Sequence, residues 1–584
     1  MDKRTVIAYI LIIAVIFLMP VYYNLFVPSS ESPVNVSDTV SVAPDTAGTP
    51  ETQSEEPATP APAAPSELQA AEQPAPASSI PAGELDTLVI ETSQYWITLS
   101  NQGGGTIQSI RLKHYFGPNG EEYAELIPPD QRHVLTVSTT GFEAQTINYV
   151  NKVFTLENLR PTRSLDTLHV EEPTPLRYVY ETPEGGILTK TLTFYPDQYQ
   201  FGLTISLNHF QDVIANRRYQ VTWNSGIAIT EENVRDDLTY SKAYSLLAND
   251  LVDVDASKAK PGSPATESFE GDTRWVAVRN KYFTSIITPV SREAAGMQLV
   301  GTQIDRQAFQ FKQYDASLVM PYQENDAQRD SFFVYVGPLD YNILTSYNRD
   351  FPRMMNFGWK IIRPISKGVL WAFTALHKFI PNYGLVLILF GVVVKILVFP
   401  LTKKSYVSMK EMQILQPKVQ ELRDKYKNDS QKMNEEMMKL YKEHGVNPMG
   451  GCLPMLLQMP LLYALFIVFR STIELRGANF FWWIKDLSQP DTVFTLPFSL
   501  PLYGANVNIL PLIMAVTMIV QQRMTSTGSS QQQKMMMWIM PIFFLLIFNN
   551  FPSGLNLYYA LFNLMTIIQQ KWFIDIPSGT PATK

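Results

Sequence analysis

The long apolar segments constrain the fold most, because they gather at the two ends of the chain. One segment begins at Thr5, and five more follow residue 380, with a polar stretch of roughly 350 residues between the two groups. Apolar runs of about 20 residues can cross a bilayer as helices. The composition agrees, since 46% of the 584 residues are hydrophobic and only 17% are charged. Together these features indicate a membrane protein rather than a soluble enzyme.

The N-terminal apolar run, Thr5–Val27, follows Lys3 and Arg4. It is longer than the apolar part of a typical signal peptide, and no small-residue cleavage pattern follows it. Residues 1–27 are therefore predicted to be a transmembrane anchor whose N-terminus lies in the cytoplasm. Residues 28–84 contain eleven prolines, nine acidic residues and no lysine or arginine, which predicts a disordered periplasmic tether.

Residues 85–345 show short runs in which apolar and polar residues alternate, for example Ile187–Tyr195 and Phe201–Leu207. This period of two, with turn residues between the runs, predicts a β-sandwich on the extracytoplasmic side. Its histidines lack the spacing of metal ligands, and no nucleophile motif or phosphate-binding loop is present, so neither a metal nor another cofactor is expected. A membrane-tethered carbohydrate-modifying enzyme remains an alternative, against which stands the lack of a paired-carboxylate motif.

Residues 355–380 have helical periodicity, with an apolar stripe opposite Lys360, Lys367 and Lys378. Trp359 and Trp371 fall beside the stripe, which is typical of a helix that lies in the membrane interface. A surface helix packed on the β-domain is the alternative.

Residues 381–575 are predicted to form a core of five membrane-spanning helices. The expected spans are Tyr383–Leu401, Leu453–Phe469, Val507–Gln521, Met535–Phe548 and Gly554–Phe573. With the anchor they make six, so both termini, including the short tail 576–584, are expected in the cytoplasm. The ten lysines and arginines between Lys403 and Lys442 agree with this topology, whereas Arg470, Arg476 and Lys485 lie in a loop assigned to the outside.

The basic segment 403–445 has three-four spacing of apolar residues and predicts a cytoplasmic helical hairpin with a kink at Pro417. Methionines supply much of its apolar stripe, notably Met409, Met412, Met433 and Met437. Flexible thioether side chains suit contact with varied apolar partners, although the same methionines could simply seal the hairpin.

Lys395 is the one charged residue inside the apolar run Leu385–Phe399. Charges at membrane depth are costly and usually functional, although this lysine is close enough to Lys403 to snorkel toward the cytoplasm. Other polar side chains lie in the other spans, so we expect a water-accessible groove that opens to the cytoplasm. Its predicted residues are Lys395, Gln458, Gln522, Asn556, Tyr559 and Asn563. A small-solute secondary transporter is the alternative, but none of the five apolar runs contains the acid that a transporter usually pairs with a buried base.

Four stretches resemble the YidC-type membrane protein insertases of Gram-negative bacteria. They are KILVFPLTKKSYVSMKEMQILQPK, NPMGGCLPMLLQMPLLYALF, FPSGLNLYYALFNLMTIIQQ and, in the β-domain, VAVRNKYF. The resemblance implies a multi-domain membrane protein: an all-β periplasmic β-supersandwich, an α-helical insertase core of five spans and an N-terminal anchor. It also implies a non-enzymatic protein of the inner membrane that inserts nascent membrane proteins, alone or with the Sec translocon. No specific nucleic acid partner is expected.

Matching by position, Lys395 lies where the family usually has the arginine of its groove, and Tyr559 matches a tyrosine implicated in substrate contact. Gly391 lies where some relatives have a polar residue. The tail after Lys571 has only one further basic residue, Lys584. Ribosome contact, which relatives with long basic tails make through the tail, is therefore expected to fall to the cytoplasmic loops.

Overall fold

The computed structural model describes residues 86–159, 166–260, 263–306, 309–323, 327–427, 429–446, 453–500, 503–525 and 531–572. The predicted anchor, tether and tail, together with Cys452, lie outside the described residues.

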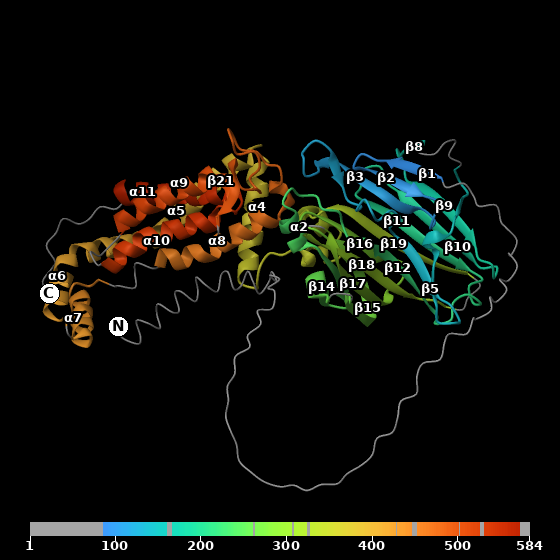
Figure 1. Cartoon of the computed structure of the whole chain (residues 1–584), viewed down its shortest axis with the longest axis horizontal. Coiled ribbons are helices and arrows are strands. Elements are labelled where there is room, and N and C mark those ends of the chain that lie inside the picture. Colours follow the sequence, from blue (N-terminus) through green and yellow to red (C-terminus); the bar gives the residue numbers. More distant parts are fainter. Residues whose placement is uncertain are drawn as a thin grey trace, which may run out of the picture. The chain divides into compact units, whose positions relative to one another are not determined.

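The β-domain, residues 87–338, contains two large sheets (Figure 1). The smaller has five strands in the order β4-β3-β2-β1-β8, and β1 and β8 are parallel. The larger has 14 strands in the order β6-β5-β12-β18-β17-β15-β16-β19-β11-β10-β9-β7, with β13 and β14 attached at β15. The bounds are β1 Thr87–Glu91, β2 Tyr95–Ser100, β3 Thr106–Phe116, β4 Tyr123–Glu125, β5 Thr136–Thr140, β6 Thr146–Asn148, β7 Thr155–Leu156, β8 Asp166–His169, β9 Thr174–Glu181, β10 Ile187–Phe194, β11 Gln200–Asn208, β12 Arg218–Asn224, β13 Lys242–Leu247, β14 Asp250–Val254, β15 Ala265–Arg279, β16 Phe283–Pro289, β17 Ala294–Arg306, β18 Phe309–Pro321 and β19 Ala327–Pro338.

The alternation of apolar and polar residues in the sequence corresponds to an alternation of more and less buried side chains in the strands. In β11 every second side chain is buried, and its antiparallel partners are β10 and β19. The buried side chains of both sheets form one core cluster, with Trp223 and Trp275 among the largest. A large all-β domain, as predicted, is therefore present.

The helices that follow the β-domain form a second core (Figure 1). Helices α9, α10 and α11 run side by side in the figure, and α11 also packs against α5 and α8. The helix bounds, with the short α2 of the β-domain, are α2 Val234–Tyr240, α3 Tyr341–Ser346, α4 Ile362–His377, α5 Tyr383–Ile414, α6 Gln416–Lys425, α7 Ser430–Glu443, α8 Leu453–Ser471, α9 Ile509–Thr525, α10 Gln531–Phe548 and α11 Ser553–Trp572.

Among the described residues, α5 alone is both long and apolar enough to cross a membrane by length and composition; α8, α9 and α10 contain shorter apolar segments. Several helices extend beyond the apolar runs that predicted them, because backbone hydrogen bonds continue where the side chains become polar. Helix α10 begins at Gln531 rather than Met535 and has 18 residues, so it is less short than the sequence suggested.

The cytoplasmic hairpin differs from the prediction in its first arm. Residues 403–414 continue α5 without a break, and Pro400 lies inside this helix. The chain breaks at Leu415, and Pro417 occupies the first turn of α6, where a proline is tolerated. The hairpin proper consists of α6 and α7, which pack against each other.

Helix α4 packs mainly on other helices. Its Val369 and Phe373 belong to the helical core cluster, whereas Leu370 belongs to the core cluster of the β-domain. Ile361, which the periodicity placed on the apolar stripe, is exposed just before the helix begins, and Trp371 is exposed as well.

Candidate functional site

Five residues of α11 form a polar stripe along one side of the helix: Asn556, Tyr559, Asn563, Thr566 and Gln570. They are spaced alternately by three and four residues, which places them on one face. All except the half-buried Tyr559 are buried. Polar side chains inside a helical membrane domain need partners within the protein, and neighbouring helices supply them for Asn556 Nδ2, Asn563 Nδ2 and Thr566 Oγ1.

Lys395 on α5 contacts the polar stripe directly. Its Nζ donates to Thr566 Oγ1 at 2.6 Å and lies 3.8 Å from the centre of the Phe562 ring. Only 7% of the lysine is exposed, and Thr566 Oγ1 in turn donates to the Phe562 carbonyl at 2.7 Å. The side chain therefore reaches across to α11, which is not the arrangement that snorkelling to the membrane surface requires.

The other predicted groove residues have partners at different depths. Asn563 Nδ2 donates to Thr517 Oγ1 of α9 at 3.4 Å, and Asn556 Nδ2 donates to the Phe548 carbonyl at 3.1 Å. Gln458 of α8 donates to the Tyr558 hydroxyl at 3.3 Å, so it lies next to the stripe rather than on it. Gln522 lies near the end of α9.

The comparisons with known proteins cover both parts of the chain. The family model described as 60Kd inner membrane protein matches residues 375–578, and the model described as YidC periplasmic domain matches residues 87–372. The membrane protein insertase YidC of Chlorobium luteolum is 37% identical over 512 residues, which cover 86% of this chain and 85% of the relative. The chain belongs to the YidC family of membrane protein insertases.

A second curated relative has the same name. The membrane protein insertase YidC of Chlorobaculum tepidum is 37% identical over 494 residues, covering 84% of this chain and 82% of the relative. A crystal structure titled as an active YidC insertase with its first transmembrane domain resolved is 19% identical, with a TM-score of 0.36, and covers 83% of this chain and 92% of that one. As a YidC-family member, the chain inserts membrane proteins, and its β-domain is periplasmic.

The YidC-family assignment shows which end of the helices faces the periplasm. Arg470, in the last turn of α8, and Arg476, just beyond it, form ion pairs with Asp236 and Glu231 of the β-domain. This end of the helices is therefore periplasmic. The same pairs explain why two arginines occur in a loop assigned to the outside, because their charges are neutralised by the β-domain.

The periplasmic end of the stripe is closed by aromatic side chains. Phe548 lies 4.8 Å from Phe551 and 5.5 Å from Tyr559, measured between ring centres, and Phe551 lies 5.1 Å from Phe466. A Cβ on Gly554 would come within 2.3 Å of the Phe469 ring. The helices therefore pack closely around Gly554 and these rings.

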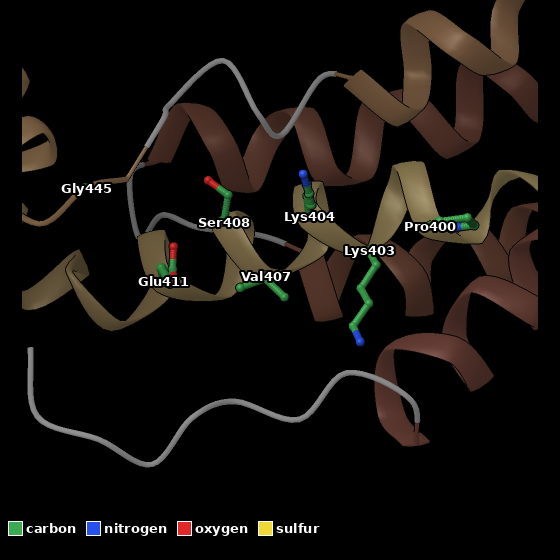
Figure 2. Close-up of a pocket in the computed structure, with 7 residues that line it drawn as sticks. All are labelled: Pro400, Lys403, Lys404, Val407, Ser408, Glu411 and Gly445. Carbon is green, nitrogen blue, oxygen red and sulfur yellow. The ribbon is translucent and has the colours of Figure 1, made fainter.

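Near the opposite end of the helices the structure has two cavities. A pocket of about 580 Å³ lies along the end of α5, and Figure 2 shows Lys403 and Lys404 pointing away from each other beside it. A second cavity, of about 30 Å³, lies between α5, α9 and α11 and is lined partly by Tyr406, Gln413 and Gln570. The pocket is lined by Pro400, Lys403, Lys404, Val407, Ser408, Glu411 and Gly445.

Reasoning from the sequence missed Thr566 and Gln570. Both continue the three-four spacing that Asn556 and Asn563 begin, so extending that period along α11 would have found them. Phe562 and Thr517 carry no comparable signal, because an aromatic or hydroxyl residue in an apolar helix is ordinarily a packing residue.

The four predicted hairpin methionines are half-buried. Met409 and Met412 lie on the cytoplasmic extension of α5, and Met433 and Met437 lie on α7. Each therefore keeps part of its thioether side chain accessible. Among the described residues, no group of three or more His, Cys, Asp or Glu side chains could hold a metal ion.

Proposed function

We propose that this insertase receives nascent membrane proteins in a polar groove that opens to the cytoplasm between α5, α9 and α11, with Lys395 at its floor. The bond of 2.6 Å between Lys395 Nζ and Thr566 Oγ1 carries the proposal. It holds the only charge of the apolar run against an uncharged partner, and a carboxylate of a substrate would be a stronger partner than a hydroxyl. Before a substrate binds, the polar stripe of α11 forms hydrogen bonds within the protein. When the substrate enters the groove, bonds to the substrate replace them.

Entry begins at the pocket beside Lys403 and Lys404, where two cations attract an acidic or polar segment. The segment then moves along the stripe toward Lys395, while the aromatic side chains at the periplasmic end keep the route closed. Next the apolar part of the substrate leaves sideways along α11 into lipid. No nucleotide is consumed, because burial of the apolar segment in lipid supplies the free energy.

We also propose six spans with both termini in the cytoplasm. Helix α9 has 17 residues, which gives about 26 Å at 1.5 Å per residue, against a hydrocarbon thickness of about 30 Å. A span of this length favours local thinning of the bilayer. Thinning shortens the distance that a polar segment must cross.

The expected partners in the cytoplasm follow from charge and exposure. The ten lysines and arginines between Lys403 and Lys442 suit the phosphate-rich surface of a translating ribosome. The methionines of α5 and α7 suit the apolar segment that emerges from it. Cooperation with the Sec translocon belongs to the same proposal and is supported by the family alone.

Site-specific crosslinking tests the route. A photoreactive residue is placed at Tyr559 or Lys395, with Phe142 of the β-domain as the matched exposed control. The proposal expects crosslinks from Tyr559 and Lys395 to the apolar segment of a ribosome-stalled nascent membrane protein, and none from Phe142. Crosslinks that are equally weak from all three positions would exclude the groove.

Substitution of Lys395 tests whether its positive charge attracts acidic segments of the substrate. Lys395→Ala is expected to reduce insertion of substrates with acidic translocated segments, and Lys395→Arg is expected to retain it, because arginine keeps the charge. Substrates with uncharged translocated segments serve as the internal control. Wild-type yield of every substrate in Lys395→Ala would show that electrostatic attraction plays no part.

A further inference from the structure

A β-hairpin stands at the periplasmic ends of α9 and α10. It consists of β20 (Thr492–Leu500) and β21 (Gly504–Asn508), and of the described strands these two pair only with each other. The sequence from Thr492 to Asn508 contains no charged residue. An uncharged hairpin on the water side of a membrane protein calls for a physical explanation.

Both faces of β20 are exposed, and the face that carries Phe494, Leu496, Phe498 and Leu500 is apolar. Every residue of β20 except Leu496 is exposed, including Val493 at 54%, Phe494 at 60% and Phe498 at 58%. Because neighbouring residues of a strand point to opposite faces, neither face is covered by the described part of the chain. The other face carries Thr495 and Ser499, and a strand with one apolar and one mildly polar exposed face suits the boundary between lipid and water.

The hairpin is held firmly at its base. Asn549, directly after α10, donates through Nδ2 to the carbonyls of Tyr503 at 2.9 Å and Asn506 at 2.7 Å. Asp491 Oδ2 accepts from the backbone N–H groups of Ile509 at 3.1 Å and Leu510 at 2.8 Å, and so caps α9. Trp483 Nε1 donates to the same oxygen at 3.0 Å. These bonds fix the position of the strands relative to α9 and α10.

The apolar surface of the hairpin continues that of α9. This helix begins directly after β21 and exposes Leu512, Ile513, Val516 and Val520. In a membrane-embedded helix, exposed aliphatic side chains contact lipid. Beside the hairpin, Phe481 and Trp482 are also exposed, the tryptophan at 81%, and aromatic residues of this kind are enriched at membrane interfaces.

We infer that β20–β21, together with Phe481 and Trp482, lies in the headgroup region of the periplasmic leaflet and fixes the depth of α9 and α10 in the bilayer. The hydrocarbon interior is excluded, because each strand has a free edge whose backbone groups need water or headgroups as partners. The occupant is the outer leaflet itself, and the inference does not depend on the groove. This placement fixes the periplasmic end of the short α9 at the membrane surface. Thinning of the bilayer would then be imposed from the periplasmic side.

Depth-dependent fluorescence quenching tests this placement. The full-length chain, with Cys452→Ser, receives one cysteine for a nitrobenzoxadiazole label and is reconstituted into vesicles of phosphatidylethanolamine and phosphatidylglycerol. Phe498→Cys and Val493→Cys report on the hairpin, and Phe142→Cys is the exposed control in the β-domain. Nitroxide groups are carried on the headgroup, at carbon 5 or at carbon 12 of the acyl chain.

The inference expects emission at shorter wavelength for both hairpin labels than for the control, with stronger quenching from the headgroup and carbon 5 than from carbon 12. Emission and quenching equal to those of Phe142→Cys would place the hairpin in water and overturn the inference. Strongest quenching from carbon 12 would place it in the hydrocarbon and overturn the interfacial position. Emission at shorter wavelength without nitroxide quenching would show that protein covers the hairpin, which also overturns the inference.

Discussion

Lys395 shows how a single buried cation can be accommodated inside a helical core. Among the described residues no carboxylate pairs with it, and its contacts are the Thr566 hydroxyl and the Phe562 ring. A hydroxyl and an aromatic face offset part of the cost of burial but provide less than a full ion pair would. In the proposed mechanism, an anionic group of the substrate would therefore compete successfully with the hydroxyl for the lysine.

Replacing Thr566 tests this balance. Thr566→Val removes the acceptor of the bond of 2.6 Å and should destabilise the helical core by about 1.5–3 kcal/mol, the usual worth of a hydrogen bond to a charged group. Thermal unfolding of the solubilised protein measures the loss. Thr566→Ser keeps the hydroxyl and is the matched control, so equal destabilisation by both substitutions would assign the effect to packing.

Lys190 is a second buried lysine, located in β10 of the periplasmic domain. Its Nζ donates to the carbonyls of Gly103 and Leu135, both at 2.9 Å, and both acceptor residues have left-handed backbones, with φ of 73° and 72°. Burial lowers the pKa of Lys190 from 10.5 to about 7, because the charged form loses its hydration. Lys190 therefore links two tight backbone turns, and its burial favours the uncharged form of the side chain.

The pKa of Lys190 predicts how stability depends on pH. Between pH 7 and 10.5 the unfolded chain binds this proton and the folded chain does not, so the contribution of Lys190 to the free energy of unfolding increases as pH increases. Lys190→Met lacks this titration. The stability of wild type relative to Lys190→Met should rise by about 1.4 kcal/mol per pH unit above pH 7, measured by urea unfolding of the β-domain transition. Parallel pH profiles for the two proteins would contradict it.

At the scale of elements, the end of α8 and the segment after it are joined to the β-domain by largely buried charges. Asp236 of α2 binds Arg470 and also Lys281, the latter at 2.8 Å. Arg476 Nε binds Glu231 at 2.7 Å. Burial alone would raise the pKa of Asp236, but Lys281 and Arg470 outweigh it and hold the pKa below its ordinary value of 3.8. This contribution is present above pH 3.8 and is lost as the pH falls through the lower pKa of the folded protein.

Removing Asp236 should therefore be costly. Asp236→Ala leaves Lys281, which is 1% exposed, without its carboxylate, and breaking a buried pair in this way costs about 3–5 kcal/mol. Glu270→Ala is the control, because the Glu270–Arg218 pair is exposed to solvent and should contribute little to stability. Thermal unfolding and protease cleavage near Arg476 measure the two effects. Equal stability of the two variants would show that the junction is not held by these charges.

At the scale of the whole molecule, polar and aromatic side chains divide the helical core along its axis. Thr566 and Gln570 lie toward the cytoplasmic end of α11, whereas Phe548 and Phe551 close the periplasmic end. This division predicts access from one side only, which separates an insertase from a transporter with alternating access.

Alkylation of single cysteines tests one-sided access. In the Cys452→Ser chain, Asn563→Cys and Gln570→Cys should react with a membrane-impermeant maleimide added on the cytoplasmic side of oriented vesicles and stay unmodified from the periplasmic side. Phe142→Cys, exposed on the periplasmic domain, should show the opposite preference. Modification of Asn563→Cys from both sides would favour the transporter alternative.

Periodicity predicted the elements of this fold well. Alternation in residues 85–345 predicted strands because one face of each strand is buried, and the apolar runs after residue 380 predicted helices. The β20–β21 hairpin was expected to be part of a loop, although Phe494, Leu496, Phe498 and Leu500 alternate with Thr495, Pro497 and Ser499 in its first strand. In the candidate site, Asn556, Asn563 and Lys395 stand out among apolar neighbours, whereas Thr566 does not.

By itself, the sequence determined the family, the order of the domains and the presence of a cation inside an apolar helix, because these depend on composition and spacing along the chain. Only the tertiary structure decided what that cation contacts. Lys395 and Thr566 are 171 residues apart, and their bond exists because α5 packs closely on α11, where Gly391 lies against Leu561. Likewise, Arg470 and Arg476 look like exceptions to the charge rule until the fold brings Asp236 and Glu231 to them. Contacts between distant residues depend on how elements pack, and a pattern along one chain does not record that packing.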